Sequence, residues 1–158
     1  MQDSISNILF SFLVLNVVLK AQSNPRSIYK NGFGIQLGGP TAVLSVSYNH
    51  FWTANINGEV GVGILGAYTG AKYYFGKENK KQLAATYVGA TIAIIPPFFS
   101  KGFQRVIYIP LGVQLMSRTG FHFSFEIAPL FLKDYGEMPG LMNDVILFGG
   151  LKIGKNFR

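Results

Sequence analysis

Residues 55–75, NINGEVGVGILGAYTGAKYYF, alternate between apolar side chains on one side and polar side chains or glycine on the other. Alternation with a period of two is typical of a β-strand with two different faces. A turn at Leu65-Gly66 would fold the segment into a hairpin that brings Glu59 opposite Lys72. Because directly opposed residues share a face, we expect this acid and this base to meet on the polar face. The apolar face would carry Ile56, Val60, Val62, Ile64, Tyr73 and Phe75.

The direction in which the apolar face points separates two classes of barrel. A soluble barrel hides this face inside, whereas a membrane barrel turns it to lipid and keeps polar groups in the lumen. Charged residues make up 13% of the chain, about half of the roughly 25% usual in soluble domains. No stretch after residue 20 has the ~20 apolar residues that a transmembrane helix needs. The interleaved hydrophobicity therefore predicts strands exposed to lipid, with a soluble lipid-binding barrel as an alternative.

The first residues predict a signal peptide over 1–22, followed by one barrel domain over 23–158. An apolar run from Ile8 to Leu19 suits the core of a signal peptide and is too short to span a bilayer. Asp3 and the lack of a base before this run depart from the usual pattern, and a buried first helix is the alternative. Cleavage after Ala21 or Gln22 would remove one acid and one base and leave the net charge of +7 unchanged.

The alternation continues to the C-terminus and predicts an all-β, eight-stranded, antiparallel up-and-down transmembrane barrel. The expected strands are 31–38, 41–52, 55–64, 67–75, 83–95, 104–116, 121–131 and 144–157. Most approach the ~9–11 residues of a tilted membrane strand, and an even number places both termini on one side. Val43 is expected in the lumen. Pro110 and Pro129 would each remove a ladder donor, so we expect both near a rim where the ladder ends.

The final stretch GGLKIGKNF resembles the C-terminal strand of bacterial outer-membrane barrels, which ends in an aromatic residue preceded by alternate apolar residues. Leu151, Ile153 and Phe157 match that pattern, whereas Lys155 stands where an aromatic residue is common and Arg158 follows the final Phe. The segments GFGIQLGGP, LSVSYNHFW, IPLGVQLMS and GLKIGKNF also resemble, in order, small outer-membrane barrels of the Bacteroidetes type. This resemblance covers about residues 31–158. It implies an outer-membrane location and no catalytic residues.

The polar face predicts a network inside the barrel. Its members would be Glu59, Lys72, Glu126, Lys152, His122, Gln114 and Tyr74. An unpaired charge in a narrow lumen is costly, so we expect the two acids and two bases to neutralise one another. Eight strands leave an interior just wide enough for side chains to fill, and four tyrosines would fill much of it: Tyr68, Tyr74, Tyr87 and Tyr108. These features favour a plugged lumen.

Two other functions stay open. One is a narrow channel for small solutes, which would need the lumen side chains to line a wall without meeting. The other is a barrel enzyme that modifies lipid A, with His122, Ser124 and Glu126 on one strand face as its catalytic group. That trio would point into the lumen near the turn at 117–120, away from lipid, so we interpret it as part of the polar network.

The sequence offers no site for a metal or a cofactor. It has no cysteine, and its two histidines, His50 and His122, fall on different expected strands. The glycines of GVGILGAYTG precede no helix, which excludes a phosphate-binding loop. The net charge of +7 comes without a basic helix or an aromatic–basic nucleic-acid motif. We attribute the charge to contact with anionic lipid headgroups and expect no nucleic-acid partner.

We therefore expect a structural or interaction barrel in a bacterial outer membrane, without catalysis. Connections near 39–40, 65–66, 96–103 and 133–143 would be extracellular, and those near 52–55, 76–82 and 117–120 periplasmic. Phospholipid and lipid A are the expected lipid partners, and a protein partner could bind the extracellular loops. The expected loop contacts are Phe98, Phe99, Lys101, Met138 and Met142.

Overall fold

The structure is a computed structural model that describes residues 24–76, 83–96, 104–134 and 144–158. In chain order, its elements are the helix α2 (Pro25–Ile28), β1 (Asn31–Gly38), the 3-10 turn η1 (Gly39–Thr41), β2 (Leu44–Phe51), β3 (Ile56–Gly63), β4 (Gly66–Tyr74), β5 (Ala84–Ile95), β6 (Gln104–Tyr108), β7 (Leu111–Met116), β8 (Phe121–Asp134) and β9 (Asp144–Phe157). The predicted signal peptide, 1–22, lies outside the described residues.

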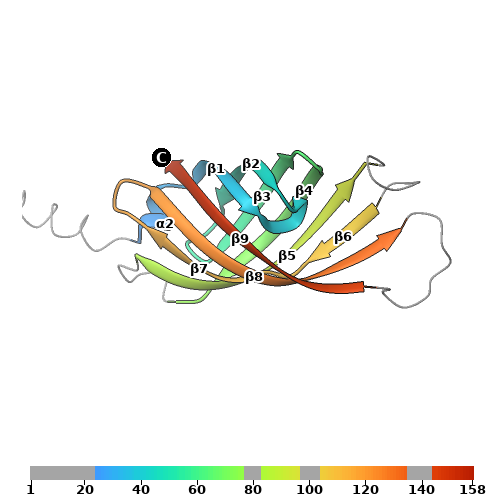
Figure 1. Cartoon of the computed structure of the whole chain (residues 1–158). Coiled ribbons are helices and arrows are strands. Elements are labelled where there is room, and N and C mark those ends of the chain that lie inside the picture. Colours follow the sequence, from blue (N-terminus) through green and yellow to red (C-terminus); the bar gives the residue numbers. More distant parts are fainter. Residues whose placement is uncertain (1–23, 77–82, 97–103, 135–143) are drawn as a thin grey trace, which may run out of the picture.

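The nine strands close into one antiparallel barrel with eight strand positions, which confirms the predicted all-β fold (Figure 1). β6 and β7 share one position, because both lie between β5 and β8. Pairing of β4 with β5 closes the sheet. α2 and the C-terminus lie at one end of the barrel, which we call the terminal end. The opposite end, where β1 leads into η1, is called the far end.

Side chains along the strands alternate between the outside and the lumen, as the sequence predicted. Phe33 on β1 is 63% exposed and Val62 on β3 is 59% exposed, although both are apolar. Glu59 and Lys72 are each only 6% exposed, although both are charged. Apolar side chains thus cover the outer wall while polar side chains fill the interior.

Glycine in the lumen makes room for the largest inward side chains. Gly61 on β3 lies directly opposite Tyr68 on β4, and Gly112 on β7 lies opposite Tyr87 on β5. A methyl group added at either glycine would collide with the tyrosine ring across from it. In these two pairs, a tyrosine ring on one strand occupies the space that the glycine on the neighbouring strand leaves open.

The turn of the β3–β4 hairpin is one residue earlier than predicted. The loop is Ile64-Leu65, so Glu59 pairs with Gly70 and the expected pairing of Glu59 with Lys72 is wrong. Gly66 belongs to β4 because β5 approaches it closely: a side chain there would strike the carbonyl oxygen of Ile94. Each β3 residue pairs with the β4 residue two positions before its predicted partner. Because side chains alternate with a period of two, both charged side chains keep their predicted face. They become diagonal neighbours, which are still within reach of long side chains.

Two strand boundaries also differ from the expectation. β2 begins at Leu44, because η1 and the left-handed Ala42 (φ 66°) occupy the preceding residues. Val43, expected in the lumen, is 47% exposed. β8 continues to Asp134, three residues beyond its predicted end, because β6 and β9 both pair with it there. The predicted 133–143 connection therefore begins later, and its remaining residues lie outside the described part.

The prolines lie within the barrel wall, so the prediction that the ladder ends at them is wrong. Pro129 is inside β8 and pairs with Leu147, while Pro110 interrupts one strand position between β6 and β7. The carbonyl of Pro110 still accepts from the amide of Gly89 at 2.8 Å. A side chain at Gly89 would come 3.0 Å from the proline ring, so this glycine provides the space for it.

The lumen is covered at both ends. At the terminal end, α2 places the side chain of Arg26 inside, where it is 1% exposed. Its Nε donates to the carbonyl of Ala54 at 3.1 Å, and its guanidinium lies 5.3 Å from the ring centroid of Tyr74. At the far end, η1 is buried and lies against β4, β5, β6, β8 and β9. Neither cover was predicted from the sequence, in which residues 39–40 were expected to form only a connection between two strands.

Candidate functional site

Four charged side chains meet in the middle of the lumen, and we call them the charge network. Lys152 Nζ lies 2.9 Å from Glu59 Oε1, and Lys72 Nζ lies 3.4 Å from Glu59 Oε2. Lys72 Nζ also lies 3.1 Å from Glu126 Oε2. The order Lys152–Glu59–Lys72–Glu126 alternates in sign and sums to zero. A buried ion network of this kind is tolerable only when every charge has partners, as each has here.

Hydroxyl and amide donors complete the coordination of the two carboxylates. Glu126 accepts from the hydroxyls of Tyr87 and Tyr108 and, at 2.7 Å, from Gln36 Nε2. Glu59 accepts from the hydroxyl of Tyr68 at 2.8 Å. Hydrogen bonds to ionised acceptors are stronger than neutral ones. These donors therefore hold the carboxylates in place and reduce the cost of burying them.

Two apolar clusters enclose the charge network along the barrel axis. Toward the terminal end, Phe51, Tyr74, Ala85 and Tyr87 pack together. Toward the far end is a second cluster formed by Tyr68, Ala93, Val106, Tyr108, Ala128 and Leu130. Tyrosines in both clusters point their hydroxyls at the carboxylates, as described above. The lumen is thus plugged by the charge network in its middle, with one apolar cluster on each side of that network.

Three predicted lumen residues are buried in the lumen but lie outside the charge network. Tyr74 packs against Phe51 and Tyr87, with ring centroids 5.3 and 5.0 Å away. His122 and Gln114 are buried nearer the terminal end. Both ring nitrogens of His122, and Oε1 of Gln114, lack a hydrogen-bond partner among the described residues.

Four residues that bind the carboxylates were not predicted to do so: Gln36, Tyr68, Tyr87 and Tyr108. The three tyrosines were expected only to fill the lumen. Their role as donors depends on which side chains meet across the barrel, which a strand pattern does not contain. The predicted loop contacts Phe98, Phe99, Lys101, Met138 and Met142 lie outside the described residues.

The trio His122, Ser124 and Glu126 does not form a catalytic arrangement in this structure. All three side chains are buried in the lumen. The ring nitrogens of His122 bond neither of the other two, and both oxygens of Glu126 are occupied by the donors described above. A nucleophile–base–acid relay requires hydrogen bonds between successive members. In this geometry His122 and Ser124 pack in the lumen, and Glu126 belongs to the charge network.

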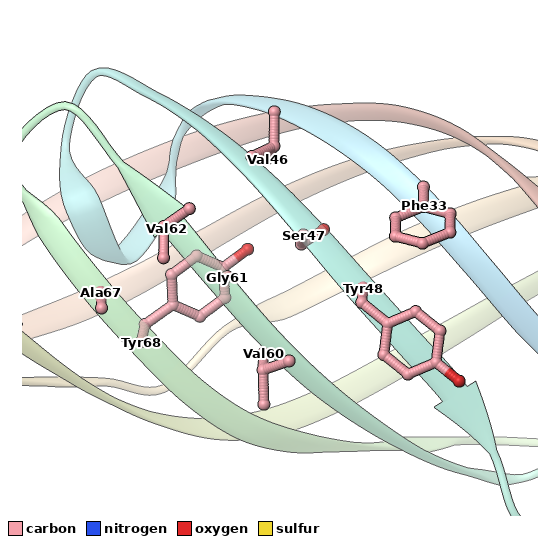
Figure 2. Close-up of a pocket in the computed structure, with 9 residues that line it drawn as sticks. All are labelled: Phe33, Val46, Ser47, Tyr48, Val60, Gly61, Val62, Ala67 and Tyr68. Atoms are coloured by element: carbon pink, nitrogen blue, oxygen red, sulfur yellow. The ribbon is translucent and has the colours of Figure 1, made fainter.

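A shallow apolar groove of about 430 Å³ lies on the outer wall over β1 to β4. Figure 2 shows Phe33 and Tyr48 together on one side of it, with ring centroids 5.4 Å apart, and Val60, Val62 and Ala67 on the other. None of the lining residues is charged. The groove therefore offers an apolar contact surface and no group for acid–base chemistry.

Neither a metal cluster nor a spanning helix is found in the described part of the chain. No group of three or more His, Cys, Asp or Glu side chains in these residues could hold a metal ion. No helix in the same residues is long and apolar enough to cross a membrane.

The fold defines the class of this protein as a closed, eight-stranded antiparallel β-barrel. Within that class, the distinguishing features are an apolar outer wall and a neutral charge network between two end covers. Comparisons with protein-family models, with curated proteins and with solved structures find no match.

Proposed function

We propose that this chain is an integral barrel of a bacterial outer membrane, with a plugged polar lumen and a structural or interaction role without catalysis. One observation carries the proposal: the distribution of polarity is inverted relative to a soluble barrel. The outer wall presents side chains such as Phe33, Val62 and Leu147, all more than half exposed, while both acid–base pairs are inside. Lipid is the solvent in which such a wall is stable.

The lumen supports a barrel that does not conduct. Ions would have to pass Arg26 and α2, the charge network, two apolar clusters and η1. Eight-stranded barrels have an interior that side chains can fill. The role would then reside on the outer wall and in the loops rather than in the lumen.

In the proposed orientation the terminal end faces the periplasm and the far end faces outward. The partners would be phospholipid in the inner leaflet, lipid A in the outer leaflet and a protein at the extracellular loops. We propose the loop residues Phe98, Phe99, Lys101, Met138 and Met142 as contacts for lipid A or that protein.

Refolding of the full chain into phosphatidylcholine vesicles tests membrane integration. We expect a compact band that shifts on heating in gel electrophoresis and a strand core protected from protease. We also expect the expressed protein in the outer-membrane fraction of a bacterial host. A chain that stays folded in the aqueous phase without detergent would contradict the proposal and favour the soluble lipid-binding barrel.

Two further measurements separate the proposed role from its alternatives. In planar bilayers we expect no steady current, and a reproducible single-channel conductance would instead establish a channel. We expect the mass spectrum of lipid A to be the same in cells with and without the protein. A mass shift that Ser124→Ala abolishes would establish the lipid-modifying enzyme.

A further inference from the structure

Four exposed basic side chains gather on one sector of the barrel at the terminal end: Lys30, Arg118, Lys155 and Arg158. Asn31 pairs with Phe157 in antiparallel strands, so Lys30, which precedes Asn31, lies beside Arg158, which follows Phe157. The amide of Asn156 donates to the carbonyl of Gly120 at 2.8 Å, so the β7–β8 turn that carries Arg118 lies beside β9. We call these four residues the basic rim cluster.

No acidic side chain of the described residues lies near the basic rim cluster. The described part contains four acids, of which Glu59 and Glu126 are inside the lumen. The other two, Asp134 and Asp144, are at the far ends of β8 and β9. Among the described residues, therefore, no acidic side chain balances the four positive charges of the cluster, and an anion from outside would do so.

The cluster borders directly on the apolar outer wall. Lys155 lies between two aromatic residues on the same face, because it pairs with Phe33 on β1 and with Phe121 on β8. Phe157 follows on that face, and the guanidinium of Arg158 lies 5.8 Å from the ring centroid of Tyr29. Long basic side chains can lay their stems on apolar surface and extend their charges to its polar edge. A ligand that fits must carry an anion and an adjoining apolar chain.

We propose that the basic rim cluster binds the phosphate headgroup of an anionic glycerophospholipid, whose acyl chains lie along Phe33, Phe121 and Phe157. This inference rests on the proposed membrane integration and adds a preferred lipid and a position for it. Arginine and lysine are suited to phosphate, and the neighbouring phenylalanines suit acyl chains. A glycerophospholipid supplies both the phosphate and the apolar chains in one molecule.

The test uses the full chain refolded into detergent micelles, with equal amounts of phosphatidylglycerol and phosphatidylcholine added. Native mass spectrometry then measures which lipid stays bound. We expect more phosphatidylglycerol than phosphatidylcholine to stay bound. This preference should weaken in high salt, because salt screens the electrostatic attraction between the basic side chains and the anionic headgroup. The variants are Lys155→Gln with Arg158→Gln and, as a second pair, Lys30→Gln with Arg118→Gln. The matched control is Arg105→Gln, an exposed base on β6 near the far end.

Each pair of substitutions should reduce the preference, by about fivefold for each base removed, while the control leaves it unchanged. Equal retention of the two lipids, or a preference that survives both pairs, would overturn the inference. The heat-dependent band shift in phosphatidylcholine vesicles is measured on every variant, because it reports integration without an anionic lipid. Loss of that shift in the unmodified chain would overturn the proposed function as well, whereas normal integration without preference rejects the lipid site alone.

Discussion

The ammonium of Lys152 lies 2.9 Å from Oε1 of Glu59, although β1 and β2 separate their two strands in the sheet. The ion pair therefore spans the lumen rather than running along the wall. With Lys72 and Glu126 it joins β3, β4, β8 and β9 through side chains alone. Backbone hydrogen bonds join neighbouring strands around the circumference, and the ion pairs of the charge network join opposite walls through the lumen.

Glu59→Gln should destabilise the barrel strongly, because it leaves Lys152 without its ion pair and removes one of the two partners of Lys72. Removal of one member of a buried ion pair costs about 3–5 kcal/mol. The measurement is the free energy of unfolding in urea, with the barrel in detergent micelles. Lys155→Gln, which neutralises an exposed charge on the outer wall, is the control and should change stability little. Equal effects of the two substitutions would argue against the network.

The double variant Glu59→Gln with Lys152→Gln should be less destabilised than the sum of its single variants. Both ends of the 2.9 Å ion pair are then neutral, so the second substitution no longer leaves an unpaired charge behind. Coupling between contacting residues is typically about 0.5–3 kcal/mol. Strict additivity in the same unfolding measurement would show that the two side chains do not interact.

Gly61→Ala should destabilise the barrel by about 1–3 kcal/mol, the usual cost of overpacking. The added methyl group would collide with the ring of Tyr68. Gly149→Ala is the matched control, because its nearest neighbour would be 3.5 Å away. The double variant Gly61→Ala with Tyr68→Ala should lose less free energy of unfolding than the sum of the two single variants, because the methyl group no longer collides with a tyrosine ring. A Gly61→Ala protein as stable as the control would contradict the close packing.

Arg26→Ala should lower stability by about 1.5–3 kcal/mol, the range for hydrogen bonds that involve a charged group. The substitution removes the bond to the carbonyl of Ala54 and the contact with Tyr74. We expect the barrel to remain closed to ions in planar bilayers, because the charge network and η1 are untouched. Arg118→Ala, on the exposed turn, is the control. A steady current from Arg26→Ala would show that α2 alone closes the lumen.

Trp52, the single tryptophan, should report on the membrane boundary at the terminal end. It is 59% exposed, and its ring lies over Gly58. In vesicles we expect its fluorescence to be quenched more by lipids brominated near the headgroup than by lipids brominated deep in the acyl chain. A variant with Trp52→Phe and Val60→Trp moves the reporter to the middle of β3, away from the turns at both ends of the strand, and should reverse that order. If the fluorescence quenching of both tryptophans did not depend on the depth of the bromine, the result would contradict membrane integration.

The two faces of each strand could be predicted because the side-chain period of a strand is a local property. That period placed Glu59 and Lys72 on the polar face, the low charge content and interleaved hydrophobicity turned this face to the lumen, and the cost of burying charge required the two residues to be neutralised. The turn predicted at Leu65-Gly66 was one residue too late, because Gly66 belongs to β4 and allows the close approach of Ile94 on the neighbouring strand β5, a contact that the hairpin sequence does not contain.

The contacts across the lumen also lay beyond sequence reasoning. Which strands face each other in a closed barrel depends on its stagger and tilt, and so the bond from Gln36 to Glu126 follows from no local pattern. The cover formed by α2 was missed for a different reason. It is four residues long, with no periodicity to detect, and its effect comes from the single buried side chain of Arg26.

The charge network also makes the neutrality of the lumen depend on the C-terminal strand. Glu59, Lys72 and Glu126 come from β3, β4 and β8, whereas Lys152 comes from β9, the last strand among the described residues. Without β9, the interior would hold two carboxylates against one ammonium, an imbalance that opposes dehydration of the lumen. Pairing of β9 with β1 and β8 closes the wall and, through Lys152, neutralises the interior. Closure of the barrel wall and dehydration of the charged lumen side chains thus depend on the same strand.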